Sequence, residues 1–391
     1  MVTEACTTPG SQAALRQANE RRVVDTLRSQ GTCTQAELAR ATGLSAASVS
    51  NIVRGLRTSG TVAVRATSSN GRRARAVTLL RPPGTVVAVD FASDRLRVAV
   101  ADHEGRLLER EAIDYDVAAD PERAVRRAAW LTETVLFRGR VDLASVSSVV
   151  ASVPAPLDPA TGTVGAVSCM PRWTGFRPAE ALQERLGRPV RVENDANLAA
   201  VAERRRGAAR GADTVMHLLL DEGVGAGLVL DGRLLRGADG TAGEIGHIGL
   251  DPRGQVCRCG NRGCLETFVG ISYLLAMVPR GSDLARDGQV ELPRLVEAAH
   301  EGDPSSRRIV SEAGTALGQG TAIVANLFNP DRVVVGGPLA AAGGLLLDPM
   351  LRAMELGTLG SALERVDVVT GELGELAALY GALLVAAEVP V

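Results

Sequence analysis

The chain has 391 residues, of which 46% are hydrophobic and 23% are charged, and its formal net charge at pH 7 is −2. A chain of this length and composition buries a full core and is expected to form two or three domains. The first twenty residues contain no apolar run typical of a signal peptide, and no stretch approaches the ~18 apolar residues of a membrane span. We therefore expect a cytoplasmic protein and exclude a membrane protein.

Charge is unevenly distributed along the chain. Residues 1–81 contain 12 arginines and four acidic residues, a balance of +8, whereas the remainder contains 31 arginines and 41 acidic residues, a balance of −10. A basic segment joined to an acidic body indicates an anionic partner for the N-terminal part. The alternative is a merely solvated basic surface, so the segment needs a motif to decide between the two.

The basic segment contains the pattern of a helix-turn-helix. Apolar residues at helical spacing predict a first helix over residues 19–29. Thr34 and Glu37 form the sequence signature of a capping box, which predicts a second helix from Gln35 to about Thr42. Gly43 ends this helix, and Ser45 is placed to cap a third helix that runs to about Thr58. The apolar residues of the last two helices are spaced to pack on each other.

A β-hairpin is predicted directly after these helices. Two β-rich runs, TVAVRAT at 61–67 and ARAVTLL at 74–80, flank SSNGRR, which contains the Asn-Gly turn signal. Helices followed by a hairpin with a basic tip are typical of a winged helix-turn-helix. We expect residues 81–85 to be a linker to the body.

The helix that follows Ser45 exposes short polar side chains, which allow a helix to lie deep in the major groove of double-stranded DNA. Asparagine can pair with adenine N6 and N7, and arginines on the wing can contact phosphates or the minor groove. A winged helix that binds protein is the alternative. The candidate DNA-binding residues are Ser45, Ser48, Ser50, Asn51, Arg54, Arg72, Arg73 and Arg75.

The body contains a repeated pattern. TVVAVDFASDRLRVAVADHEGRLLER begins at residue 85 with a strand, a turn, a second strand and a glycine-containing turn, and DTVMHLLLDEGVGAGLVLDGRLLRG repeats that plan from residue 213. Two related hairpins that each open an α/β half predict a body of two lobes with a cleft between them.

Four motifs of the body carry a family resemblance: ENDAN at 193–197, GEIGH at 243–247, CRCGNRGCLE at 257–266 and NPDRVVVGGPL at 329–339. In this order and spacing the chain resembles regulators of the ROK family, from about residue 19 to its end. The resemblance implies an α/β, actin-like and hexokinase-like body behind the winged helix-turn-helix. We expect domains at 1–82 (DNA-binding), 83–200 (lobe 1) and 201–391 (lobe 2), with the C-terminal helix returning to lobe 1.

The cysteine cluster of the third motif has the spacing of a metal site. Cys257, Cys259 and Cys264 follow His247 by ten or more residues, and four N and S ligands suit a tetrahedral Zn²⁺ that is closed to solvent. A disulfide is disfavoured in a reducing compartment, and a redox pair lacks the C-x-x-C spacing. Gly260 and Gly263 are expected to let the backbone curl so that the sulfurs converge. We predict about one structural zinc ion per chain, and the resemblance implies the same four ligands.

The resemblance also implies a sugar site. In the family, residues that match Asn194, Asp195, Glu244, His247 and Glu266 hydrogen-bond sugar hydroxyls. Hydroxyl-rich ligands need paired donors and acceptors of this kind in a concave site. The alternative is an acidic cleft that serves only solubility.

The family's kinases hold phosphates in two glycine-rich loops, D-x-G-G-T and G-T-G-x-G-G-G. In this chain the first loop reads DFASD at 90–94, without either glycine, and the second reads DEGVGAG at 221–227. Cβ atoms and two carboxylates stand where phosphate must approach. We therefore expect a sugar-responsive transcriptional regulator, most simply a repressor, and not an enzyme. The alternatives are a residual ATP-dependent sugar kinase with a DNA-binding head, and a scaffold whose acidic body binds a protein.

Assembly is the last expectation from the sequence. A single winged helix buries too little surface for tight, specific binding, so regulators of this type dimerise on two-fold sites. We expect a homodimer or a dimer of dimers that reads an inverted-repeat operator.

Overall fold

The computed structural model describes residues 12–69, 72–79, 84–166, 169–279, 282–285 and 290–388. The chain forms two compact units that meet in the sequence at residues 83 and 84. Among the described residues, no helix combines the length and apolar character needed to cross a membrane. The predicted linker lies largely outside the described residues, because only residues 84 and 85 of it are described.

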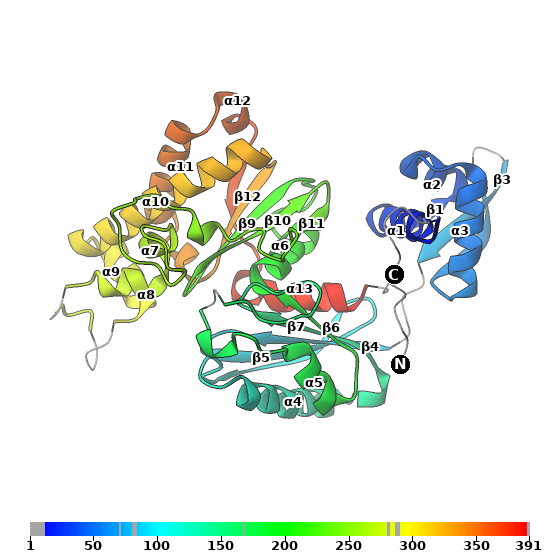
Figure 1. The fold of residues 1–391 in the computed structure, drawn as a ribbon, viewed down its shortest axis with the longest axis horizontal. Coiled ribbons are helices and arrows are strands. Elements are labelled where there is room, and N and C mark those ends of the chain that lie inside the picture. The colour runs from blue at the N-terminus through cyan, green and yellow to red at the C-terminus, as the bar shows by residue number, and fades with distance from the viewer. Residues whose placement is uncertain are drawn as a thin grey trace. The chain divides into compact units, whose positions relative to one another are not determined.

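The first unit packs three helices on a small antiparallel sheet with the strand order β1-β3-β2. The capping box of Thr34 and Glu37 begins the second helix, and the Ser45 side chain caps the third, as predicted. The first helix begins at Gln12, earlier than the predicted residue 19. The elements, most of them labelled in Figure 1, are α1 (Gln12–Gln30), β1 (Cys33–Thr34), α2 (Gln35–Thr42), α3 (Ala46–Thr58), β2 (Val62–Ser69) and β3 (Arg72–Leu79).

The buried faces of these helices form one apolar core. Val23, Leu38 and Val49, one from each helix, are fully buried together with Val77 of β3. The β2–β3 hairpin matches the predicted wing, with Ser69 paired to Arg72 across its tip. The Asn-Gly turn itself, residues 70 and 71, lies outside the described residues. The first unit is therefore a winged helix-turn-helix.

The second unit contains two five-stranded sheets with the same topology. Their strand orders are β6-β5-β4-β7-β8 and β11-β10-β9-β12-β13, and in each the first three strands are antiparallel and the last two add in parallel. The first sheet consists of β4 (Thr85–Phe91), β5 (Arg95–Asp102), β6 (Leu107–Asp114), β7 (Val146–Val153) and β8 (Val190–Asn194). The second consists of β9 (Val215–Leu220), β10 (Val224–Leu230), β11 (Arg233–Leu235), β12 (Arg332–Gly336) and β13 (Asp367–Thr370). This match explains the sequence repeat.

Helices cover both faces of each sheet. On the first sheet, α4 (Pro121–Arg138) and α5 (Pro178–Leu186) share a core with the strands, and α13 (Ala377–Ala386) lies on the opposite face (Figure 1). On the second sheet, α10 (Pro304–Phe328) and α11 (Gly344–Gly357) cover one face, and α6 (Asp195–Arg206) covers the other. We call the first sheet with α4, α5 and α13 the first lobe, and the second sheet with α6, α10 and α11 the second lobe.

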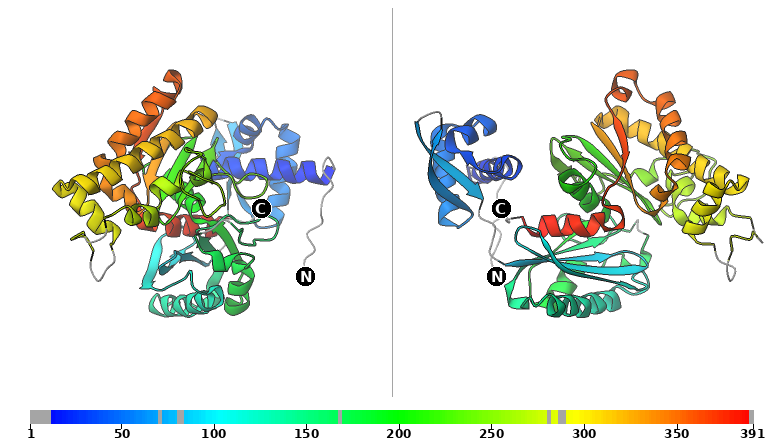
Figure 2. Two further views of the ribbon diagram at one scale, coloured as in Figure 1. Left: turned by 60° about the vertical axis from the view of Figure 1, so that its left-hand side comes forward. Right: turned by 180° about the vertical axis from the view of Figure 1, so that it is seen from behind.

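The two lobes exchange their last helices. Helix α6 directly follows the first sheet but packs on β9 and β10, and α13 follows the second sheet but packs on β4 and β7. The two helices also lie against each other, with α13 in red across the first sheet in Figure 2. A Cβ on Gly381 would stand 2.0 Å from the Leu198 carbonyl oxygen, so this crossing requires glycine.

A long segment between β11 and α10 distinguishes the second lobe. It contains the GEIGH and cysteine motifs, and two isolated bridges, Gly249 with Cys264 and Val256 with Arg262, hold its loops together. Its helical elements are η3 (Ile245–His247), α7 (Glu266–Val269), α8 (Ile271–Ala276) and α9 (Leu292–Glu301). We call residues 236–291, the part of this segment that precedes α9, the insert. The short helix α12 (Gly360–Leu363) follows α11.

Candidate functional site

The second unit holds a pocket of about 210 Å³ that residues of both lobes line. All five predicted sugar-binding residues line it: Asn194, Asp195, Glu244, His247 and Glu266. The first lobe adds the turn after β4, and the second lobe adds the turn between β9 and β10. The structure therefore brings these five residues, which lie between positions 194 and 266, together with residues from the turns of both sheets.

Asn194 and Asp195 lie where β8 ends and α6 begins. The Asn194 side chain caps the helix, since its Oδ1 accepts from the Asn197 N–H at 3.0 Å, and its Nδ2 donates to the Ala155 carbonyl at 3.3 Å. Asp195 Oδ1 accepts from the N–H of Ala196 at 2.8 Å. Burial raises the pKa of Asp195 well above its ordinary value, and nearby carboxylates, Asp90 first among them, raise it further.

Glu244 and His247 are placed by glycines of the GEIGH motif. A Cβ on Gly243 would stand 1.9 Å from the Ala226 carbonyl oxygen, and one on Gly246 would stand 2.4 Å from that of Val224. Glycine thus lets this backbone lie directly on β10 and directs both side chains to the pocket. Burial, followed by the charge of Glu266, raises the pKa of Glu244 to about 7.

Glu266 is a buried carboxylate at the start of α7, with 3% of its surface exposed. Its Oε1 accepts from Arg258 Nε at 2.7 Å, and the Cys257 thiol lies 3.7 Å from the same oxygen. Arg258 also donates to the Glu222 carbonyl oxygen at 3.2 Å. Arg258 was not predicted as a site residue, although its place between Cys257 and Cys259 indicates that it lies at the same site.

The four predicted metal ligands converge. The ligand atoms of His247, Cys257, Cys259 and Cys264 all lie within 4.8 Å of one another. Cys257 Sγ is 3.5 Å from His247 Nδ1, and Cys259 Sγ is 3.6 Å from Cys264 Sγ. A tetrahedral zinc with Zn–S bonds of about 2.3 Å has S–S edges of about 3.8 Å. The cluster therefore has the donor set and the spacing to hold one metal ion.

The local backbone and burial fit this cluster. Gly260 and Gly263 have φ angles of +90° and +58°, as expected for the tight curl between the cysteines. A Cβ on Gly263 would stand 1.8 Å from the Asp251 carbonyl oxygen. Burial raises the pKa of the Cys264 thiol to about 12, so this thiol stays protonated at neutral pH unless a cation is bound.

His247 faces both sites. Its Nδ1 points to the cysteines, while its Nε2 lies 3.9 Å from Glu244 Oε2 at the pocket. One imidazole therefore connects the metal cluster with the pocket, and the two roles predicted for this residue use different ring nitrogens.

Carboxylates occupy the turns that the resemblance aligns with phosphate loops. Asp221 and Glu222 from the second lobe and Asp94 from the first line the pocket. Burial raises the pKa of Asp221 to about 6, and the charges of Glu222 and Asp94 contribute to the rise. Glu222 has a raised pKa for the same reasons, burial first and then Asp94.

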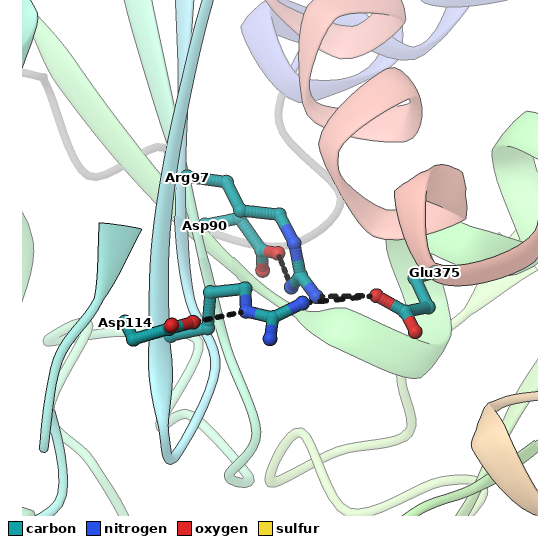
Figure 3. A network of polar contacts seen from close by, with 5 residues as sticks. Asp90, Arg97, Asp114 and Glu375 are labelled. Carbon is teal, nitrogen blue, oxygen red and sulfur yellow. Dashed lines mark hydrogen bonds and ion pairs between the residues drawn. The ribbon is translucent and has the colours of Figure 1, made fainter. Parts of the chain in front are cut away.

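An ion-pair network lies beside the turn that follows β4 (Figure 3). Arg97 of β5 donates to Asp90 of β4 at 2.9 Å and to Glu375 at 3.1 Å. Arg95 contacts Asp114 at 3.0 Å and the same Glu375 oxygen at 3.5 Å. Glu375 follows the last strand of the second sheet in the chain, and the network connects it to β4 and β5 of the first lobe. Arg97 was not predicted from the sequence, because its pairing with Asp90 depends on the register of β4 and β5.

The candidate DNA-binding face lies in the first unit. Asn51 and Arg54 are exposed on α3, and Arg75 is exposed on β3. The Ser45 and Ser48 hydroxyls lie 2.9 Å apart at the helix start, where Ser45 acts as the cap, and Ser50 is half-buried. The side chains of Arg72 and Arg73 lie outside the described residues, although their backbone belongs to β3.

Taken together, a duplicated α/β body with an interlobe pocket and a winged helix-turn-helix define a class of protein, a kinase-like fold joined to a DNA-binding unit. The family comparisons match both parts. The ROK family matches residues 86–389, and the MarR family matches residues 17–74. The chain belongs to the ROK family.

Individual relatives include regulators and kinases. The xylose repressor of Caldicellulosiruptor bescii is 24% identical over 388 residues and covers 96% of both chains. The crystal structure of a ROK family transcriptional regulator, a homologue of the E. coli MLC protein, is 26% identical with a TM-score of 0.73, over 95% of this chain and 99% of the other. A ROK glucokinase from Streptomyces griseus, solved with glucose and AMPPNP, is 30% identical with a TM-score of 0.67, over 77% of this chain and 99% of that one.

Proposed function

We propose that this protein is a sugar-responsive, DNA-binding transcriptional regulator, most simply a repressor. The observation that carries the proposal is the presence of both parts in one chain, a winged helix with exposed Asn51 and Arg54 and a pocket lined by the five family residues. The similarity to a xylose repressor over 96% of both chains supports the same conclusion, since it includes the first unit. The glucokinase covers only 77% of this chain.

The decisive experiment measures DNA binding and its response to sugars in the full chain. Duplexes selected from a random library are titrated with protein, with and without each member of a sugar panel. We expect selected duplexes to share an inverted repeat and at least one sugar to change their affinity. A 100-fold change needs only about 2.7 kcal/mol of coupling. The proposal would be contradicted if no DNA sequence were selected, or if no sugar changed the affinity for the selected duplexes.

The roles on the DNA-binding face can be separated. Asn51 is proposed to read bases from α3, together with Ser48 and Arg54, and the wing arginines Arg72, Arg73 and Arg75 are proposed to contact the DNA backbone or minor groove. Asn51→Ala should lose discrimination between operator variants. Arg75→Ala should weaken binding to all DNA sequences about equally and should lower the slope of binding affinity against salt concentration.

The metal ion is proposed to be zinc in a structural role, bound by His247, Cys257, Cys259 and Cys264. Three sulfurs and one imidazole nitrogen match the ligand preference of Zn²⁺, and four protein ligands leave no open position for a reactant. When bound, zinc supplies a positive charge that keeps the cysteines deprotonated. Mass spectrometry of the native protein should find about one zinc ion per chain.

A residual sugar kinase is the second candidate. The observation that favours it is Asp195, whose raised pKa and place in the pocket suit a general base for a sugar hydroxyl. Against it stand Asp221 and Glu222 at the turn where phosphate would lie. We propose that the chain is not an enzyme. A coupled assay with ATP and the sugar panel tests this, and turnover that Asp195→Asn abolishes would establish the kinase instead.

The protein is proposed to act as a homodimer or a dimer of dimers. Two winged helices related by a two-fold axis match an inverted repeat and bury enough surface for specific binding. Sedimentation velocity of the full chain should show an assembly larger than the 40.7 kDa of one chain. A monomer that binds a single half-site tightly would contradict this.

A further inference from the structure

The charges that line the pocket restrict what it can bind. Among the residues that the structure describes, eight carboxylates and three arginines line it, and the chain contains no lysine. An anionic ligand needs a cation or free N–H groups to replace the water it loses on binding. The pairing of the three arginines therefore decides whether the pocket can offer a cation to an anionic ligand.

Each of these arginines already pairs with a carboxylate. Arg97 is held between Asp90 and Glu375, and its side chain is only 11% exposed. Arg95 contacts Asp114 and Glu375, and Arg258 contacts Glu266 at 2.7 Å. A phosphate group would therefore meet only arginines whose positive charge a carboxylate already offsets.

The positive end of α6 is also occupied. A helix N-terminus attracts anions through its unpaired N–H groups and its dipole. At α6 the Asn194 side chain takes the Asn197 N–H, and the Asp195 carboxylate takes the Ala196 N–H. The chain's own carboxylate thus holds the place that an anionic ligand would use.

The remaining carboxylates repel further negative charge. The five others, Asp94, Asp195, Asp221, Glu222 and Glu244, have no arginine within ion-pair distance among the described residues. Mutual repulsion contributes to the raised pKa values of Asp195 and Asp221, which shows that the pocket already opposes its own ionisation. These carboxylates do not converge as a metal site either, since in the described part of the chain only the His247 cluster is packed closely enough for one ion.

We infer that the effector of this pocket is an unphosphorylated sugar, and that Asp221 and Glu222 exclude sugar phosphates from it. The inference rests on the proposed sugar-sensing function and names the chemical class of the effector. Both residues belong to the turn between β9 and β10, and neither is required to hold the hydroxyls of a neutral ring, which the five family residues are proposed to do.

The test compares matched pairs of ligands by isothermal titration of the full chain. Glucose, xylose, N-acetylglucosamine and glucosamine are each measured beside their own terminal phosphate. We expect a member of this set to bind at least roughly 100-fold more tightly than its phosphate, because the phosphate carries close to two negative charges at neutral pH. A phosphate that binds as tightly as its parent sugar, or more tightly, overturns the inference.

A charge-neutral variant identifies the residues responsible. In the double variant Asp221→Asn/Glu222→Gln, the preference for the parent sugar over its phosphate should fall below about 10-fold. The affinity for the phosphate should rise, while the affinity for the parent sugar should change little. The control is Glu184→Gln, which replaces an exposed carboxylate on α5 with a carboxamide. It should keep the full preference for the parent sugar over its phosphate. An unchanged preference in a folded double variant overturns the assignment to these residues. If neither member of any pair binds, the proposed sugar-sensing function fails first, and that result is distinct from tight phosphate binding.

Discussion

The two lobes of the body share one strand topology but use the end of their first strand differently. In the first lobe, Asp90 on β4 is buried and paired with Arg97 on the neighbouring strand at 2.9 Å. In the second lobe, Asp221 follows β9 and faces the pocket without an arginine partner among the described residues. Both carboxylates line the pocket, but the one in the first lobe is held by an ion pair and the one in the second lobe is not.

The insert of residues 236–291 is the second difference. The first lobe connects β6 to β7 mainly through α4, whereas the second connects β11 to β12 through the insert, α9 and α10. Glu244, His247 and Glu266 all come from the insert, together with the metal cluster. The shared sheets therefore supply the scaffold, and the unshared segment supplies three of the five predicted sugar-binding residues and all four candidate metal ligands.

The largest expected effect is loss of the metal cluster. Cys264→Ser should abolish metal binding, because a buried ligand is lost, and should lower sugar affinity at least 100-fold, since Glu244 and Glu266 flank the same loops. Metal content and titration calorimetry measure both. Arg253→Gln, an exposed change in the same loop, should leave both intact. Hydrogen exchange should show that β4 and β5 of the first lobe keep their protection, and uniform loss of protection would contradict the division between lobes.

The next effect concerns the buried aspartate of the first lobe. Arg97→Met should lower the free energy of unfolding by about 3–5 kcal/mol, because it leaves Asp90 buried without its partner. Glu375→Gln should cost less than about 1 kcal/mol, since that side chain is 57% exposed and exposed pairs contribute little. Urea denaturation measures both. Equal costs would show that the network acts as one unit.

The crossing of the exchanged helices is predicted to be similarly sensitive to volume. Gly381→Ala should destabilise the body by about 2–4 kcal/mol, because the new Cβ would overlap the Leu198 carbonyl oxygen at 2.0 Å. Gly360→Ala on α12 has nothing within 4 Å and is the matched control, with an expected change of about 0.5 kcal/mol or less. Thermal unfolding distinguishes them, and a harmless Gly381→Ala would mean that the helices can separate.

The smallest effect depends on pH. His217 of β9 is buried with both ring nitrogens lacking a partner among the described residues, and burial lowers its pKa to about 4. The unfolded chain binds this proton near pH 6.5, so the folded state loses stability as the pH falls through that value. The loss is roughly 2 kcal/mol between pH 7 and pH 5. In His217→Leu the free energy of unfolding should fall less over this range, and an identical pH dependence would contradict the burial of a neutral imidazole.

Patterns with short range were predictable from the sequence. The capping box of Thr34 and Glu37, the hairpin wing and the positive φ angles of Gly260 and Gly263 depend on neighbouring residues, and the structure confirms each. The repeated strand pattern also predicted two related lobes correctly, and the two sheets have matching strand orders although their longer connections differ.

Contacts between distant segments were not predictable. The pairing of Arg97 with Asp90 depends on the register of β4 and β5, and its contact with Glu375 spans 278 positions. The packing of α6 on the second sheet reverses what its place after β8 indicates. The five pocket residues came from the family resemblance, and periodicity alone would not have found them. The structure adds which of them are already engaged, as Asn194 is in capping α6.

The exchange of α6 and α13 has a consequence for biosynthesis. All five strands of the first sheet have emerged by residue 194, but the helix that covers one of their faces begins only at residue 377. At a translation rate of about 5–20 residues per second, that apolar face waits roughly 10–40 s for its cover. The winged helix, complete within the first 79 residues, has no such delay. On the ribosome we therefore expect the DNA-binding unit to fold well before the sensor, and chaperones that hold exposed sheets to associate with the chain during this interval.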